Sequence, residues 1–508
     1  MAKLLATLKA GEWLPDLPEH DNPGSPMVEN VLWVNGAYVP APAFSSLGAA
    51  LSARCQGSYA ATDANGDTHI YAGTASQLLE YNGTGFTVRG TGFTTGDGQY
   101  WKFTEYSSPG FPAFVVGVNF ADAPQALEAG DAAFVALAGS PPKAAAIGAI
   151  SQFLMMGNTE EIVNGVVPNR VQWCGIANPT NWTFGTLAAQ EAQAGEQFLN
   201  AVYGPVTHIA DGYAYGLIFQ QRAITRAYYV GGDAIFAFDT YEKQRGAYYP
   251  NSPVQLGNLV YFLAEDGFCL TDGQQVTQIG HAKVDSTFLN DVSQAYADRV
   301  VGAYDPTTKL IRWCYCSAGN STGIPDKTIA YNHAEQRFMP TTQNLSRIFS
   351  SKSFGWTLDT LDNVDPDLDL ITPSLDDLFW QGGNIEIQAF DASNNFGQLG
   401  GDPLDAVIDT LEASPNEGGI TYLDGARPVM TGPATGTAAP TVTLLTRNIE
   451  SNGYTTSAAA SQNSSTGICN IRAAARYVRA RVTIPGGSGA GFGVFTGVDL
   501  YGSAAGQR

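Results

Sequence analysis

Charged residues are scarce in this chain of 508 residues, at 14% of the sequence, against about 25% in an average soluble protein. Basic residues are the scarcest, with 26 Lys and Arg against 47 Asp and Glu, which gives a formal net charge of −21. This balance argues against a surface that grips nucleic acid, because such a surface needs clustered Lys and Arg. It does not argue against an acidic wall past which nucleic acid slides.

Histidine and cysteine are also few. None of the five histidines sits in an HExxH, HxH or His-plus-acid pattern, so a local histidine-based site has no support. The six cysteines are spread too thinly for a dense disulfide scaffold. The histidines are His20, His69, His208, His281 and His333, and the cysteines are Cys55, Cys174, Cys269, Cys314, Cys316 and Cys469. Catalytic, cofactor-binding and metal-binding residues are accordingly expected to be absent, and we do not expect an enzyme.

Cys314 and Cys316 are two positions apart in an apolar run, so on a strand both side chains point to one face. Half of a metal site is one interpretation, but a tetrahedral zinc site needs four ligands and no second pair is near. We favour two small side chains that face the core.

Long hydrophobic runs are missing. No window approaches the ~20 apolar residues of a membrane span, and the most apolar stretch, 144–156, is short and contains Ser151 and Gln152. The first 17 residues lack the continuous apolar core of a signal peptide. We therefore expect no membrane span and synthesis in the cytoplasm.

What the chain does have is 11% aromatic residues, 57 Gly and 27 Pro. Apolar strands alternate with Gly, Asn and Asp turns, as at His69–Gly73 and at Leu259–Leu263 followed by Glu265-Asp266-Gly267. Such pairs of runs are typical of β-hairpins. About six units start every ~40–50 residues, the blade period of propellers. They lie near 50–97, 98–140, 145–196, 200–247, 252–298 and 299–340.

The sequence thus predicts an all-β protein with a β-propeller-like core. Residues 1–44 carry many prolines and are expected to form an extended N-terminal arm. Residues 45–350 form the propeller-like domain, 351–384 an acidic connector rich in Asp and Leu, and 385–508 a C-terminal β domain that resembles a sandwich. One helix is expected between blades, at Ser286–Val300, with Ser286 as its cap.

Four further patterns allow two interpretations each. Asp63–Asp67 is similar to the start of a calcium loop, but position twelve is Thr74, so a hairpin tip is favoured. The Asp/Leu run could bind calcium, although a solvated connector is the favoured interpretation. The cluster Arg472, Arg476, Arg479 and Arg481 could meet an acidic partner or protect a sheet edge. Trp101, Trp173 and Trp182 could stack on sugars, but large aromatics more often anchor the core.

Several short motifs recur in an order that resembles virion proteins of tailed phages, above all the tail tube or nozzle proteins of short-tailed (podovirus-type) phages. The motifs cover nearly the whole chain. They are Trp13–Pro18, Asn22–Gly24, Asn169–Cys174, Asn178–Thr183, Gly257–Phe262, Asp266–Phe268, Ile279–Gly280, Lys283–Asp285, Asp305–Pro306, Leu358–Asp359, Leu361–Asp362 and Ala475–Arg481.

The resemblance implies a structural protein of the virion tail with a β-propeller core. It also implies a homo-oligomeric ring, expected as a hexamer, below a portal-adaptor protein and beside other tail proteins. Genomic DNA would pass through the ring during ejection without sequence recognition, and no cofactor or catalytic residue is implied. The chain is short beside the larger nozzle proteins, so a neighbouring tail component is the other possibility. A receptor- or glycan-binding tail protein and a propeller-type polysaccharide hydrolase are the alternatives.

Overall fold

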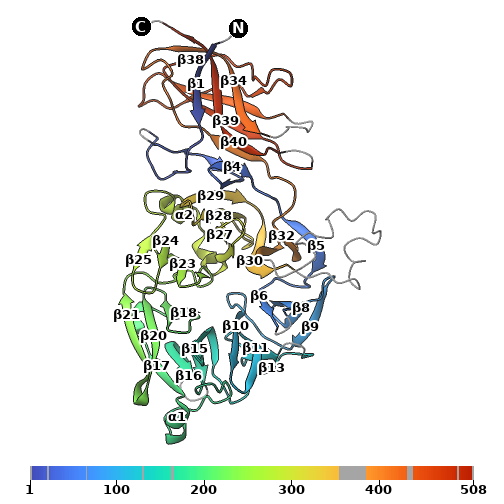
Figure 1. The fold of residues 1–508 in the computed structure, drawn as a ribbon, viewed down its shortest axis with the longest axis vertical. Helices are drawn as coiled ribbons and strands as arrows, with labels where there is room; N and C mark the ends of the chain where they lie inside the picture. The colour runs from blue at the N-terminus through green and yellow to red at the C-terminus, as the bar shows by residue number, and fades with distance from the viewer. Residues whose placement is uncertain are drawn as a thin grey trace.

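The computed structural model describes residues 3–19, 22–63, 66–128, 131–161, 165–353, 385–431, 439–488 and 491–505. In these ranges the chain is strand-dominated and forms small antiparallel sheets. Seven of the sheets described there have four strands each, and we number them blades 1 to 7. They lie around a common axis, so the fold is propeller-like (Figure 1). The prediction of an all-β, propeller-like core is confirmed.

Six blades are continuous in sequence. Blade 1 comprises β6 (Gly57–Thr62), β7 (Thr68–Gly73), β8 (Gln77–Tyr81) and β9 (Phe86–Thr91). Blade 2 comprises β10 (Lys102–Ser108), β11 (Phe111–Val118), β12 (Gln125–Glu128) and β13 (Val135–Ala136). Blade 3 comprises β14 (Lys143–Ile150), β15 (Phe153–Glu161), β16 (Gly165–Trp173) and β17 (Gly195–Phe198). Each corresponds to one of the expected units and extends at most two residues beyond it at either end.

The next three blades follow the same rule. Blade 4 comprises β18 (Val206–Ala210), β19 (Gly216–Gln220), β20 (Ile224–Gly231) and β21 (Ile235–Glu242). Blade 5 comprises β22 (Val254–Leu256), β23 (Leu259–Ala264), β24 (Gly267–Thr271) and β25 (Val276–Gln278). Blade 6 comprises β26 (Val301–Asp305), β27 (Leu310–Tyr315), β28 (Lys327–Asn332) and β29 (Arg337–Thr342).

Blade 7 closes the ring with strands from two distant parts of the chain. It contains β30 (Leu345–Lys352), β31 (Ile385–Asp391) and β32 (Asn395–Gln398), and its fourth strand is β5 (Ser45–Ala50), paired antiparallel with β32. The first strand of blade 7, β30, lies beside β6 of blade 1. Phe390 and Phe396 of blade 7 share a buried cluster with Ile70 and Tyr81 of blade 1. Blade 7 is therefore completed by strand pairing, and at this seam of the ring it packs against blade 1.

Two six-stranded antiparallel sheets lie at one side of the ring, where both chain ends are found (Figure 1). One contains β1 (Lys3–Lys9), β3 (Val31–Val34), β4 (Ala37–Pro40), β34 (Thr421–Thr431), β38 (Ala473–Ala475) and β40 (Val494–Ala504). The other contains β2 (Val28–Glu29), β33 (Ala406–Asp409), β35 (Thr441–Arg447), β36 (Thr455–Thr456), β37 (Ala460–Ser461) and β39 (Tyr477–Ile484). Their buried side chains belong to one cluster, which continues into blades 5 and 6.

Two expected boundaries differ from the structure. The N-terminal arm 1–44 is not only extended: it supplies β1 to β4, since its apolar residues pair with β40 and β33 across the length of the chain. The boundary at 385 falls inside blade 7, because β31 pairs with β30 over seven residues. The Asp/Leu connector lies outside the described residues from position 354 to 384.

The expected helix at Ser286–Val300 is shorter and interrupted. The structure has α2 (Asp285–Asp291), then the 3-10 helix η3 (Gln294–Arg299). Val292 is extended and forms a bridge with Ser317, which ends the α-helix. The cap is not Ser286: the Asp16 carboxylate accepts from the amides of Ser286 at 2.7 Å and Thr287 at 2.8 Å.

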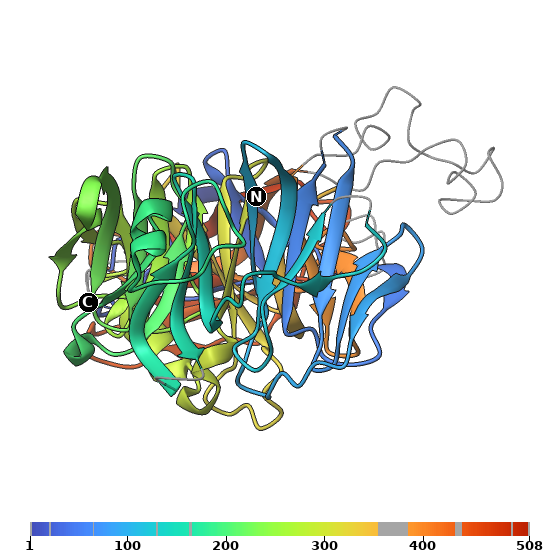
Figure 2. The same cartoon turned by 90° about the horizontal axis from the view of Figure 1, so that it is seen from below.

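The remaining helices within the described residues are α1 (Leu187–Ala192), η1 (Ala201–Tyr203) and η2 (Gly232–Ala234). None of the described helices is long and apolar enough to span a membrane. Figure 2 shows the ring edge-on, with the strands side by side and running across its thickness.

Candidate functional site

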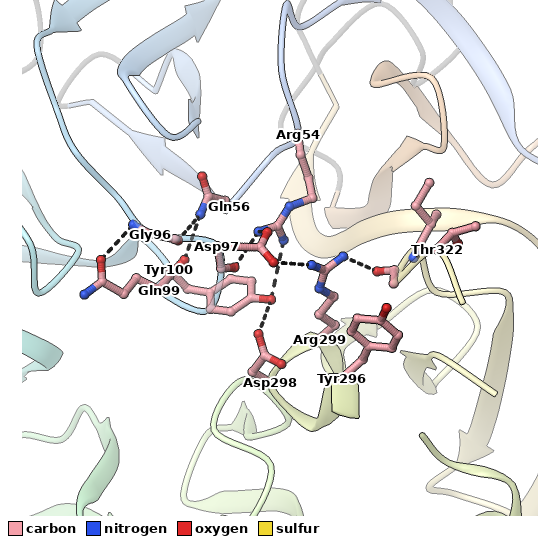
Figure 3. Close-up of polar contacts among 12 residues, drawn as sticks. Arg54, Gln56, Gly96, Asp97, Gln99, Tyr100, Tyr296, Asp298, Arg299 and Thr322 are labelled. Carbon is pink, nitrogen blue, oxygen red and sulfur yellow. Dashed lines mark hydrogen bonds and ion pairs between the residues drawn. The ribbon is translucent and has the colours of Figure 1, made fainter. Parts of the chain in front are cut away.

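Side chains from non-adjacent blades meet near the axis on one face of the ring (Figure 3). Asp97, in the connection from blade 1 to blade 2, accepts from Arg54 Nη2 at 2.9 Å and from Arg299 Nη2 at 2.8 Å. Tyr100 donates its hydroxyl to Asp298 Oδ2 at 2.9 Å. Asp298 and Arg299 lie in the segment between blades 5 and 6. These contacts therefore join that segment to the connection between blades 1 and 2, across the axis.

A cavity of about 280 Å³ lies on this axis. The first strand of every blade contributes to its lining, so the cavity belongs to the ring as a whole. Its polar groups include Ser58, Lys102, His208, Asp211, Gln255 and Arg347. It is the place in the described fold where titratable side chains from the largest number of blades converge.

Lys102 joins blade 2 to the far side of the cavity. Its Nζ donates to the carbonyl oxygens of Thr207 at 2.5 Å and Pro250 at 2.8 Å. Burial, with a smaller contribution from the Arg347 cation, lowers the pKa of Lys102 to about 7. Burial likewise lowers the pKa of His208 to about 3, so its imidazole is neutral at pH 7.

Asp211 is held on the opposite side of the cavity. Its oxygens accept from the Ala149 amide at 2.8 Å and the Thr104 hydroxyl at 2.9 Å. Burial raises the pKa of this carboxyl to about 6. Within the described part of the chain it forms no ion pair with Lys102 or Arg347. The arrangement can bind and orient a small polar molecule.

A second polar cluster lies between blades 1 and 2. His69 Nδ1 is 2.6 Å from Glu80 Oε1, and Arg89 Nε donates to Glu80 Oε2 at 2.6 Å. The hydrogen bond with Glu80 raises the pKa of His69, although burial opposes it. A cavity of about 170 Å³ adjoins the cluster and is also lined by Glu105. His69 thus meets two carboxylates, Glu80 and, with Nε2 3.8 Å from Oδ2, Asp63, although their sequence spacing gave no sign of it.

The cysteines and tryptophans singled out in the sequence are core residues. Cys314 and Cys316 are buried and unpaired with each other, and burial raises the pKa of each thiol to about 12. Among the residues that the structure describes, no three His, Cys, Asp or Glu side chains gather as metal ligands. Trp101, Trp173 and Trp182 are at most 3% exposed. A Cβ on Gly73 would lie 2.3 Å from the Trp101 ring, so that position requires glycine.

The other candidates are placed as follows. Asp63 and Asp67 lie at the turn between β6 and β7, where Asp63 Oδ1 accepts from the Asp67 amide at 2.8 Å. Arg479 and Arg481 lie on β39, which pairs on both sides, so the sheet-edge interpretation is wrong. Arg481 instead binds Asp409 at 2.7 and 2.9 Å. His20 lies outside the described residues.

The cavity residues were not singled out from the sequence. Lys102 and Arg347 each have only uncharged immediate neighbours, Trp101-Lys102-Phe103 and Ser346-Arg347-Ile348. In a chain with 26 basic residues, a cation so placed in a first blade strand is the signal that could have found them. Their convergence depends on blade order, which the local pattern does not contain.

Comparison with known proteins finds similarity to solved structures at low TM-scores. No protein-family model matches the chain, and no curated protein matches it. Among solved structures, it is similar to a chain in "Crystal structure of BBS1N in complex with ARL6DN, soaked with lead", with a TM-score of 0.41 and 11% identity over 71% of this chain and 97% of that one. It is also similar to one titled "Glycoside hydrolase", with a TM-score of 0.28 and 9% identity over 90% of this chain and 99% of that one.

Proposed function

We propose that this protein is a structural subunit of a bacteriophage tail, a ring-forming tail tube or nozzle component through which the genome passes during ejection. The proposal rests on the ordered motifs that resemble such proteins, and it assigns the chain no catalytic role. The subunit would be made in the host cytoplasm and assembled into the virion tail. Its partners would be other copies of itself in a hexameric ring, a portal-adaptor protein and further tail proteins.

The observation that carries the proposal is the placement of exposed apolar side chains. Of the 14 large hydrophobic residues exposed in the described ranges, eight belong to blades 3 and 4 or to the segments joining their strands. They are Val166, Leu187, Phe198, Val202, Tyr213, Tyr228, Tyr229 and Val230. Apolar side chains gathered on one part of a surface mark protein contacts, and a neighbouring copy would cover them in a ring.

Rigidity of the subunit supports the same proposal. The buried cluster that fills the two six-stranded sheets continues into blades 5 and 6. Arg337 lies over the Trp33 ring at 3.8 Å, and Trp33 Nε1 donates to Glu335 Oε2 at 2.5 Å. We propose that the two sheets form a sandwich-like domain fixed to the propeller through the N-terminal arm. Such a fixed pair of domains suits a wall that withstands genome passage.

The genome would pass between subunits and not through one propeller. Lys102 and the contacts of Asp97 cross the propeller's own axis. A duplex therefore has no room inside a single ring of blades. An acidic surface, given by the net charge of −21, would let the phosphates slide along the wall between copies.

The experiment is negative-stain microscopy and mass photometry of the purified protein, alone and mixed with the adaptor protein encoded beside it. Rings of about six copies are expected in at least one of the two samples. A protein that stays monomeric at high concentration and binds no adaptor would count against the proposal. The glycan-binding alternative is weakened because the three tryptophans that could stack on sugars are buried.

A further inference from the structure

The guanidinium of Arg347 lines the axial cavity without a counter-charge. Arg347 lies on β30, the first strand of blade 7, and is 9% exposed. Its Nε donates to Ser58 Oγ at 3.2 Å. Nη1 is buried and makes no hydrogen bond, and the side chain forms no ion pair with any residue in the described ranges. An arginine stays protonated in proteins, so a full positive charge faces this cavity without an ion-pair partner.

The nearby carboxylates that the structure describes make no ion pair with Arg347. Asp97 and Asp298 bind Arg54, Arg299 and Tyr100. Asp211 keeps its oxygens on the Ala149 amide and the Thr104 hydroxyl. A buried charge without a partner costs several kcal/mol. A bound anion would remove that cost.

The cavity also offers hydrogen-bond donors that suit an oxyanion. When Lys102 is protonated, its Nζ uses two of three protons on Thr207 and Pro250, and the third is available to an anion, which would itself favour the protonated form. The neutral His208 imidazole lines the same cavity and makes no hydrogen bond to a described residue. Arginine presents its donors in a planar fork that fits two oxygens of one phosphate or carboxylate group.

We propose that the axial cavity binds a small oxyanion, through Arg347 Nη1 and Nη2 with Lys102 and His208 as further donors. Phosphate is the probe chemistry that we choose, because it offers several oxygen acceptors and a negative charge to the three donors that line the cavity. The volume of about 280 Å³ is several times the ~30 Å³ that one water occupies in the liquid. The phosphate could therefore be free or attached to a small organic body such as a sugar.

Binding is tested by calorimetry and by thermal unfolding at constant ionic strength, with three probes: inorganic phosphate, glucose 6-phosphate and glucose. Phosphate should bind and raise Tm above the value in chloride, whereas glucose should do neither. Tighter binding of glucose 6-phosphate than of phosphate would mean that the cavity takes a phosphate attached to an organic group. Equal or weaker binding of glucose 6-phosphate would mean that the cavity takes the free anion. Absence of binding by both phosphate compounds overturns the proposal.

Two variants locate the site. Arg347→Met should weaken phosphate binding by about tenfold to a hundredfold, the range expected for charged hydrogen bonds. Arg222→Met is the matched control, because Arg222 is half exposed and pairs with Glu265 far from the cavity lining. Equal losses in both variants, or none in Arg347→Met, would contradict the assignment.

A measurement on the unaltered protein covers the case in which Arg347→Met does not fold. Crystals soaked in selenate should show an anomalous peak within hydrogen-bond distance of the Arg347 guanidinium. A peak only at surface cations, with the cavity empty, would overturn the proposal.

Discussion

Asp16 Oδ1 accepts hydrogen bonds from both the backbone amide and the hydroxyl of Thr287, at 2.8 and 2.7 Å, across 271 positions of sequence. The other oxygen of Asp16 accepts from the Ser286 amide at 2.7 Å. The carboxylate thus satisfies the free amides at the start of α2, where a negative charge is also favoured by the helix dipole. It fixes the N-terminal arm to blade 5, together with the ion pair of Glu12 and Lys283 at 2.8 Å.

Replacing Asp16 by Ala should lower the free energy of unfolding by about 1–2 kcal/mol, the usual cost of a lost helix cap. Urea denaturation followed by tryptophan fluorescence measures it. Asp424→Ala is the control, because Asp424 is exposed on β34 and should change stability by less than about 0.5 kcal/mol. Equal effects in the two variants would mean that the cap contributes nothing.

Phe396→Ala should destabilise the seam of the ring by about 3–5 kcal/mol, because the side chain is fully buried. Its ring lies 4.8 Å from Tyr81 of blade 1 and 5.3 Å from Phe390. Limited proteolysis should then cut near β5 earlier than in the unaltered protein. Phe111→Ala, at a partly exposed position of β11, should cost much less, and cleavage near β5 should not change.

His69 should titrate above its ordinary pKa of 6.5, because the Glu80 carboxylate stabilises the imidazolium. His333 should titrate below that value, since burial and the Lys309 cation lower its pKa. NMR of the imidazole protons measures both. Glu80→Gln should bring the pKa of His69 down and leave that of His333 unchanged.

The same shift gives the protein a dependence of stability on pH. The pKa of His69 is higher in the folded state than its unfolded value of 6.5, so protonation of His69 stabilises the fold. This stabilisation is complete below pH 6.5 and is lost as the pH rises through the raised pKa. The unaltered protein should therefore have a higher free energy of unfolding than His69→Gln at low pH, and this difference should shrink as the pH rises above 6.5. An advantage that grows over that range would contradict the assigned ion pair.

Leu187→Lys with Val202→Lys should abolish or weaken rings, because both side chains are more than 70% exposed on the apolar surface of blades 3 and 4. A charge placed in such an interface must be desolvated without a partner. Mass photometry at matched concentrations compares the oligomers. Val88→Lys, on β9 of blade 1, is the control and should assemble normally. Rings that form equally well in the double variant would move the interface elsewhere.

The sequence contained the hairpins but not their partners. The six expected units each correspond to one blade, because apolar runs separated by short turns are local information. Blade 7 was missed because β5 and β32 are separated by more than 340 positions. The cap of α2 was missed for the same reason, since Ser286 is the nearest local candidate and Asp16 is the actual one.

The residues of the axial cavity could not be predicted from the sequence for the same reason. Lys102 and Arg347 become neighbours only after the ring closes, so no spacing along the chain relates them. The tryptophans, by contrast, were expected in the core from their size alone, and Trp101 is 1% exposed. Residue type predicted burial, but it did not predict which buried cation would lack a partner.

The pairing of β5 with β32 also fixes an order of events during translation. The strand at 45–50 leaves the ribosome long before residues 395–398 exist, so its edge stays open while most of the propeller is made. The same holds for β1, whose partner β40 is nearly the last segment synthesised. Ring closure and completion of the second domain are therefore late steps in this order, and until then the unpaired strand edges are open to pairing with other chains.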